Sequence, residues 1–336
     1  MTQQKKQTIP PPGVISAIVA GFDAVTNHIA LILFPIGLDL LLWLAPHLRV
    51  KNIIEAWLTF ASQSRGEIAS FTEMSEMMGG VEKMWLLSAE RFNLLGTLRS
   101  YPVGVPSLTA GSPLMARPWG EITFIDISSV WIALLMAGAF TVAGLIVGAF
   151  YFSLVSQVAL FDEIRLLKSL ADWPRASLQV ILLAFMWLFL ILGISIPVSC
   201  GMMLFALAGI PGISFAVVIF GSILMWVAFP LLFAPHGILT NRSSLWPAIR
   251  KSVQIIRMTL PSTATFIVSL VFINQILDML WIIPPENSWL TLLGFTGHAF
   301  ATTGLLSASF VYYQQASQWV QSILDHQSAQ ATTVAG

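Results

Sequence analysis

The chain has 336 residues, of which 56% are apolar and only 10% are charged. Soluble domains carry about 25% charged residues, so this composition excludes a fully soluble protein, and lipid must surround much of the chain. Sixteen basic and sixteen acidic residues cancel, so net charge argues for no nucleic-acid partner, and the single cysteine, Cys200, excludes an intrachain disulfide.

The first 46 residues predict a tail followed by a membrane helix. Lys5 and Lys6 precede an apolar stretch, as in a signal peptide, but three prolines intervene and no small-residue cleavage site follows. We therefore expect residues 1–28 to be a cytoplasmic tail with an interfacial helix. Residues 29–46 are the predicted first span, near the lower limit of about 17 residues for crossing a bilayer.

The next segment, residues 47–128, is the only sizeable part of the chain outside the predicted spans. Amphipathic patterns at 50–64 and 81–98 predict two helices, and 121–127 suggests a short strand. Residues 101–120 collect prolines and glycines, which predicts an irregular loop. We expect a small helical extracytoplasmic cap that offers a surface to partner proteins.

The remaining residues, 129–336, predict a five-span membrane domain with a cytoplasmic tail. The spans are expected at 129–154, 178–199, 212–234, 263–283 and 289–313. The predicted fold is therefore an all-α polytopic membrane bundle of six spans. Small residues let membrane helices approach closely, and those expected to serve helix packing are Gly144, Gly148, Gly297, Ala301 and Gly304.

Basic residues are concentrated in two short links between predicted spans. The link after the second span holds Arg165, Lys168 and Arg175, and the link before the fifth holds Arg242, Arg250, Lys251 and Arg257. The links after the third and fifth spans have no Lys or Arg, so the bias of basic residues toward the cytoplasm predicts that both termini are cytoplasmic. Residues 245–260 would form a helix with one apolar and one basic side, suited to anionic lipid head groups.

Four polar residues lie where hydrocarbon would penalise them: Asp39, Asn274, Asp278 and His298. The two carboxylates and the imidazole are about 10, 8 and 13 Å from the outer ends of their spans. This similar depth leads to the hypothesis that all four residues converge in one polar layer. The layer would be a proton or cation relay, an interhelical hydrogen-bond cluster, or a set of unrelated residues near the wet interface.

Motifs of common chemistries are absent from the sequence. There is no HExxH, P-loop, GxSxG or paired-cysteine motif, and the five histidines show no ligand spacing. We expect no catalytic residue, cofactor or metal. The leading hypothesis is a non-enzymatic scaffold or accessory subunit of a complex in the cytoplasmic membrane. The alternative is a small transporter or channel that uses the polar layer, and an intramembrane enzyme ranks third.

The run GILTNRSSLWPAIRKSVQIIRMTLP, residues 237–261, resembles a pattern of a loose group of prokaryotic six-helix membrane proteins. In that group a short polar turn and an A-x-x-x-S helix precede the penultimate span, and Ala248 and Ser252 occupy those places here. The run is similar to the membrane domain attached to some glycerophosphodiester phosphodiesterases. The chain has no room for their catalytic barrel, so the resemblance implies an all-helical membrane domain without that activity. The long outer loop departs from the group's compact loops.

Overall fold

The computed structural model describes residues 10–64, 72–207 and 213–334, and these residues are overwhelmingly helical. Residues 1–9 of the predicted tail and residue 212 of the predicted fourth span lie outside the described ranges. The α-helices are α1 (Val14–Asn27), α2 (Leu33–Leu44), α3 (Lys51–Ser64), α4 (Thr72–Arg91), α5 (Val130–Phe161), α6 (Leu166–Leu207), α7 (Ile213–Ala228), α8 (Ala234–Thr240), α9 (Leu245–Trp281) and α10 (Thr291–Val334). Short 3-10 helices are η1 (Ile29–Ile32), η3 (Leu94–Leu98) and η4 (Phe229–Leu231).

Helices that are long and apolar enough to cross a membrane are the main component of the fold, as composition predicts. Among the described residues, four stretches are long and apolar enough to cross a bilayer: Val130–Phe161, Leu166–Met202, Val218–Thr240 and Leu245–Trp281. The pair α1 and α2 passes the same test together but bends by 92° between its two helices, so the count reaches five if the pair is one span. Helix α10, where we expect the last span, is not among them.

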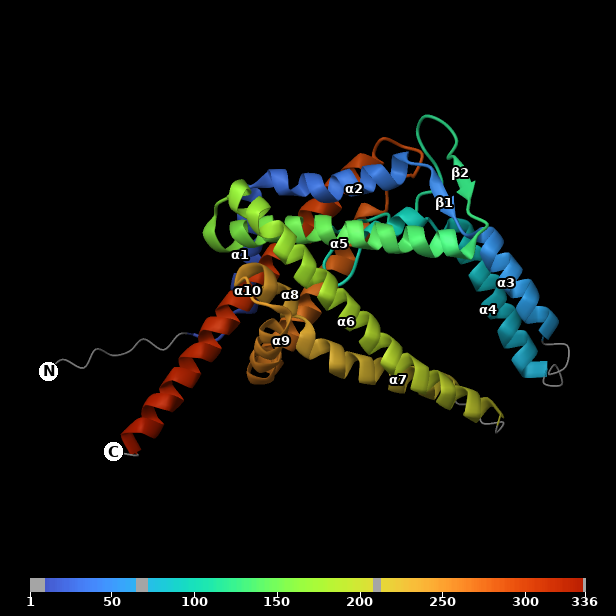
Figure 1. The fold of residues 1–336 in the computed structure, drawn as a ribbon. Helices are drawn as coiled ribbons and strands as arrows, with labels where there is room; N and C mark the ends of the chain where they lie inside the picture. The colour runs from blue at the N-terminus through green and yellow to red at the C-terminus, as the bar shows by residue number, and fades with distance from the viewer. Residues whose placement is uncertain (1–9, 65–71, 208–212, 335–336) are drawn as a thin grey trace.

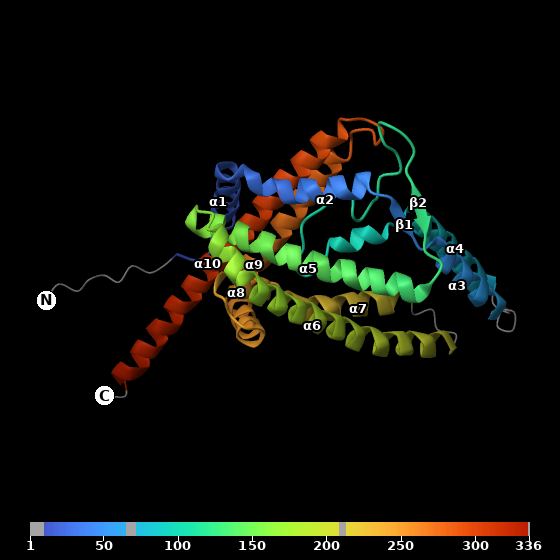
Figure 2. The ribbon, with the colours of Figure 1, turned by 45° about the horizontal axis from the view of Figure 1, so that its top comes forward.

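Helix α10 nevertheless lies at the centre of the molecule. It packs against α1, α9, α5 and α2, and it crosses the whole bundle in Figures 1 and 2. Small residues let α1 lie very close to α10: a Cβ at Gly21 of α1 would lie 2.7 Å from the Cβ of Ala308 on α10. This central position explains the lower apolarity of α10, since neighbouring helices cover the side chains that lipid would otherwise meet.

Prolines interrupt the helix of the predicted fourth span, and a side chain of α9 forms hydrogen bonds with backbone groups at the interruption. Helix α7 gives way to η4 at Pro230 and then to α8, which interrupts the regular backbone hydrogen bonding. The Ser252 hydroxyl on α9 donates to the carbonyl of Pro230 (2.7 Å) and accepts from the amide of Phe233 (3.1 Å). Ser252 is fully buried, so this side chain satisfies two backbone groups that would otherwise lack a partner.

Helix α9 joins two segments that the sequence suggests are separate. We expect a surface helix and then a span at 263–283, whereas the structure has one helix with a bend at Thr259, where φ is −116° and ψ is 20°. Pro261 lies just beyond the bend and accounts for it, because its ring cannot fit against the preceding turn. The basic segment and the span are thus one bent helix.

The two ends of the molecule carry different elements. Figure 1 shows the start of α1 and the end of α10 at one end, together with the α5–α6 turn and α8. The opposite end carries α3, α4 and a two-stranded parallel sheet of β1 (His47–Arg49) and β2 (Phe124–Asp126), the latter within the predicted strand 121–127. Arg49 donates two hydrogen bonds to Asp126, at 3.0 and 2.9 Å, and so fastens the sheet at the base of the long insertion.

Candidate functional site

Three of the four predicted intramembrane polar residues meet between α9 and α10. Asn274 donates to one carboxylate oxygen of Asp278 (2.7 Å), and Nδ1 of His298 lies 2.7 Å from the other. The side chain of His298 is 3% exposed and that of Asp278 is 23% exposed. Nε2 of His298 is buried without a hydrogen-bond partner among the described residues. The cluster links two helices and keeps one edge of its carboxylate accessible.

Asp39 makes no hydrogen bond to this cluster, so hydrogen bonds join three of the four residues, and a single layer of all four stays a prediction. Its fully buried carboxylate accepts hydrogen bonds from the Ser107 hydroxyl (2.6 Å), the Thr109 hydroxyl (2.8 Å) and the amides of Leu108 (3.1 Å) and Thr109 (3.0 Å). The Pro- and Gly-rich loop therefore enters the bundle and surrounds this charge. The four donors hold both carboxylate oxygens in place. Asp39 anchors the loop.

The same loop occupies the GxxxG face of α5, which we expected to receive another membrane helix. A Cβ at Gly144 would lie 2.1 Å from the carbonyl oxygen of Leu98, at the end of η3. A Cβ at Gly148 would lie 2.7 Å from the Cα of Gly104. That expectation is wrong about the partner: these glycines admit the backbone of residues 98–104, and Val103 and Val105 join the central apolar core.

The small residues of α10 do contact helices. A Cβ at Gly297 would lie 2.5 Å from the ring of Trp281 at the end of α9, and one at Gly304 would lie 2.7 Å from the ring of Phe22 on α1. Ala301, between them, is buried. Two aromatic rings thus fill the space that the glycines leave, which fixes α10 against α9 on one side and α1 on the other.

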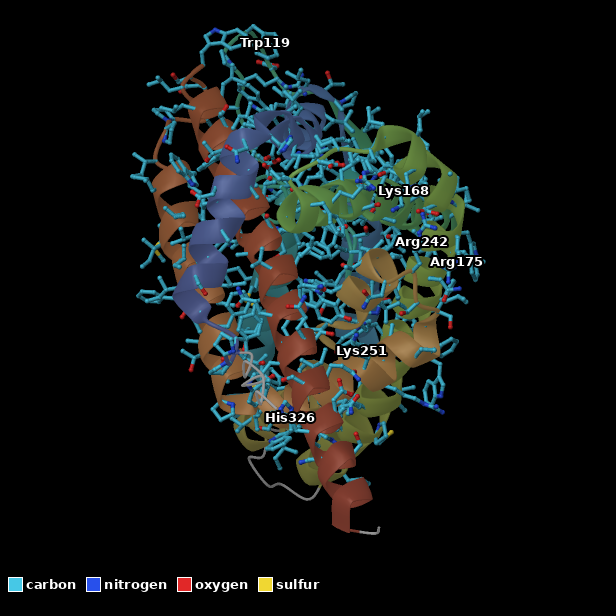
Figure 3. All side chains as sticks on the ribbon, turned by 90° about the vertical axis from the view of Figure 1, so that its left-hand side faces the viewer. Trp119, Lys168, Arg175, Arg242, Lys251 and His326 are labelled. Atoms are coloured by element: carbon cyan, nitrogen blue, oxygen red, sulfur yellow. The ribbon has the colours of Figure 1, made fainter. Side chains whose placement is uncertain are left out.

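The two basic links, distant in sequence, lie next to each other. Arg242 pairs with Asp172, and the amide of Leu245 donates to the side-chain oxygen of Gln179 (2.8 Å). Figure 3 looks onto the end that carries the α5–α6 turn and the end of α10, and it shows Lys168, Arg175 and Arg242 gathered along one edge. The contact joins the start of α6 to the start of α9, so the two links present their charges on one end of the bundle.

Not all of these charges are free for lipid. Arg242 is neutralised by Asp172, although its own segment contains no carboxylate, and Arg165 is paired with Glu163 at 2.6 Å. In the part of the chain that the structure describes, no ion pair involves the other five predicted lipid contacts, which are Lys168, Arg175, Arg250, Lys251 and Arg257. Arg250 lies 5.1 Å from the ring centre of the exposed Trp246, an arrangement typical of an interfacial helix.

At the opposite end, α3 and α4 expose a set of large apolar side chains. The members lie outside the candidate spans and are between 40% and 69% exposed: Trp57, Phe60, Met84, Trp85, Leu87 and Phe92. We call this set the α3–α4 apolar face. A cleft of about 510 Å³ adjoins it, lined by Met84, Leu87, Phe92 and Arg91 among others. An exposed apolar set with an arginine at its edge is typical of a protein-binding surface.

Sequence reasoning missed a buried histidine near the broken span. Nε2 of His236 lies 2.8 Å from the hydroxyl of Ser309, and the rings of Phe233, Phe310 and Tyr313 surround it. No spacing could reveal this contact, because Ser309 lies 73 residues away in the chain. Among the described residues, no three His, Cys, Asp or Glu side chains are grouped to hold a metal ion.

Comparisons of this chain with protein-family models, with curated proteins and with solved structures give no match. Function must therefore be argued from the two ends of the bundle and from the polar cluster between α9 and α10.

Proposed function

We propose that this protein crosses the cytoplasmic membrane six times, with both termini in the cytoplasm and α3 and α4 in a cap outside. In this arrangement α1 and α2 form one bent span, and α10 is the sixth. The 44 residues of α10 extend about 66 Å, more than a bilayer requires. The position of the start of α1 and the end of α10 at one end supports an even number of crossings (Figure 1), and the basic links at that end support the orientation.

Within that membrane we propose a non-enzymatic scaffold or accessory subunit that binds partner proteins through the α3–α4 apolar face. The observation that carries this proposal is the exposure of Trp57 and Trp85 on helices outside the candidate spans. Aromatic side chains dominate the binding energy of protein interfaces, and leaving two tryptophans in water is unfavourable. A partner protein that covers these side chains would remove them from water, and this burial would stabilise the complex.

The opposite end would hold the scaffold in position through lipid. Lys168 and Arg175 on α6 and Lys251 on α9 have no paired carboxylate among the described residues, and each basic residue near an anionic surface contributes about 1 kcal/mol. The resemblance of residues 237–261 to a membrane-domain pattern agrees with this proposal. Its Ala248 packs beside Gly237, and its Ser252 bonds the break in the fourth span.

The test is to purify the protein in mild detergent and quantify the proteins and lipids that accompany it. The double variant Trp57→Ser, Trp85→Ser should lose the accompanying proteins while keeping the lipids and the thermal stability. The matched control is Asn52→Ser, an exposed polar change on the helix of Trp57, which should lose neither. Identical protein profiles for the parent and the double variant would overturn the cap as the docking surface.

Transport is the second candidate function, and the paired Asp278 and His298 favour it. A carboxylate and an imidazole in contact between two membrane helices, with one carboxylate edge accessible, can exchange a proton. Proteoliposomes that contain the parent protein would then show a proton flux, and Asp278→Asn would abolish it. A flux equal to that of protein-free vesicles would exclude proton transport.

A further inference from the structure

One amide side chain on the outer face of α9 has no partner in a place where lipid cannot supply one. Gln275 is exposed and lies six residues before Trp281, about 9 Å along the helix from its outer end. The structure shows no hydrogen bond to its side chain from any described residue. Hydrocarbon offers neither donor nor acceptor, so an unpaired amide at this depth is costly.

Other polar side chains on α9 solve the same problem locally. The hydroxyl of Thr265 donates to the carbonyl of Pro261, and that of Ser269 donates to the carbonyl of Thr265. Asn274 donates to Asp278. Gln275 differs because its exposed side chain makes no such contact with a described residue. A group outside the chain must therefore satisfy it.

The residues around Gln275 form a seam of the kind that pairs two helices. Exposed side chains recur at alternating spacings of four and three, which is the heptad pattern of a helix pair: Val268 (67% exposed), Phe272 (65%), Gln275, Met279 (69%) and Ile282 (58%). Gln275 is at the centre of this α9 seam. Gln275 also borders a groove of about 420 Å³ on one side of the seam, which is lined by Leu270, Val271 and Asn274 of α9 and by Leu305, Leu306 and Ser309 of α10.

We propose that the α9 seam binds a second copy of this chain. Both copies insert in the same orientation, so a twofold axis along the membrane normal would place the two α9 helices parallel and bring Gln275 opposite its counterpart. A carboxamide carries a donor and an acceptor, and two of them pair reciprocally. One polar residue at the centre of an apolar seam also fixes the register of the helix pair.

The same observations disfavour other occupants. A lipid acyl chain would cover Val268 and Met279 but leave the amide of Gln275 unpaired. A different membrane protein would need a polar residue at the matching depth, whereas the second copy supplies one by symmetry. The proposal is independent of the α3–α4 apolar face, because it concerns a different helix and a different surface.

The test is disulfide cross-linking in native membranes, starting from a Cys200→Ser background. Met279→Cys, one turn along the seam, leaves Gln275 in place and should give a covalent dimer under mild oxidation, because the seam places the two copies of this position together. The control is Leu280→Cys, which is also exposed on α9 but lies on another side of the helix. Equal cross-linking at the two positions, none at Met279→Cys, or a cross-link to a different protein would overturn the proposal.

A second measurement examines the amide itself. Fluorescently labelled protein diluted into lipid vesicles should dimerise, and Gln275→Leu should weaken the dimer by about tenfold or more, because two interhelical hydrogen bonds are lost. Leucine is apolar and suits a lipid-facing position, so the Gln275→Leu monomer should remain folded. The control variant Leu280→Ala should leave dimerisation unchanged. An unchanged dissociation constant in Gln275→Leu, or a parent protein that stays monomeric at all densities, would contradict the proposal.

Discussion

The surroundings of Asp39 on α2 and of Asp278 on α9 show how differently one fold can accommodate a carboxylate in an apolar helix. Asp39 is fully buried and receives four hydrogen bonds from residues 107–109. Asp278 has two side-chain partners, Asn274 and His298, and remains partly exposed. A charge whose acceptors are all satisfied by its own chain acts as an anchor, whereas a charge with an open edge can still meet a proton or a partner.

The largest effect on stability is expected at Asp39, the carboxylate that anchors the loop of residues 107–109. Asp39→Ala would leave the hydroxyls and amides of residues 107–109 buried without an acceptor, at a cost of about 3–5 kcal/mol in the free energy of unfolding. Thermal unfolding in detergent and proteolysis within the loop measure this effect. An unfolding temperature within a degree or two of the parent would show that the loop does not depend on the carboxylate.

A smaller effect is expected where the anchored loop meets α5. Gly144→Ala would place a Cβ against the carbonyl of Leu98, and overpacking of this kind costs about 1–3 kcal/mol. Gly138→Ala, six residues away on the same helix, meets nothing within 4 Å and should be neutral or slightly stabilising. The unfolding temperatures of the two variants should differ in this direction. Equal values would contradict the docking of the loop on Gly144.

A pH-dependent effect of still smaller size is expected at the base of the insertion. Burial and the neighbouring Arg117 hold the pKa of His47 below its ordinary value of about 6.5. Because the folded state binds its proton less readily than the unfolded chain, this contribution to stability is full above about pH 6.5 and is lost as pH falls below it. Protease resistance of α3 and α4 should therefore fall between pH 7.5 and 5.

His47→Phe keeps an apolar ring in the same volume and removes the titrating group. Protease resistance of this variant should depend less on pH than that of the parent protein. The same pH dependence in both proteins would mean that another group is responsible.

Much of the fold could be predicted from apolar runs alone, because membrane helices must satisfy their backbone internally. The span around residues 129–154, the short strand near 121–127 and the contact of Asp278 with His298 all follow from local sequence or depth. The surroundings of Asp39 cannot be predicted in this way, because its hydrogen-bond donors lie 68 to 70 residues away in a loop with no periodic pattern. A Pro- and Gly-rich segment gives no sign that it enters the bundle.

The partner of a GxxxG motif is also invisible to sequence. Gly144 and Gly148 indicate close approach, and the structure confirms close approach, but the approaching backbone belongs to residues 98–104. In the same way, the cation at Arg242 is matched by Asp172 from the other basic link, 70 residues earlier. Long-range partners of this kind require the tertiary arrangement.

The most direct measurement is a side-by-side comparison of Asp39→Asn and Asp278→Asn in thermal unfolding. In Asp39→Asn the new amide NH2 group, a donor, faces the buried donors of residues 107–109, and one of the two acceptor oxygens is lost. In Asp278→Asn the new side chain still offers one acceptor and one donor to Asn274 and His298. The unfolding temperature should fall sharply in Asp39→Asn and change little in Asp278→Asn. Equal losses, or a larger loss in Asp278→Asn, would contradict the assignment of Asp39 as the anchor and Asp278 as the open site.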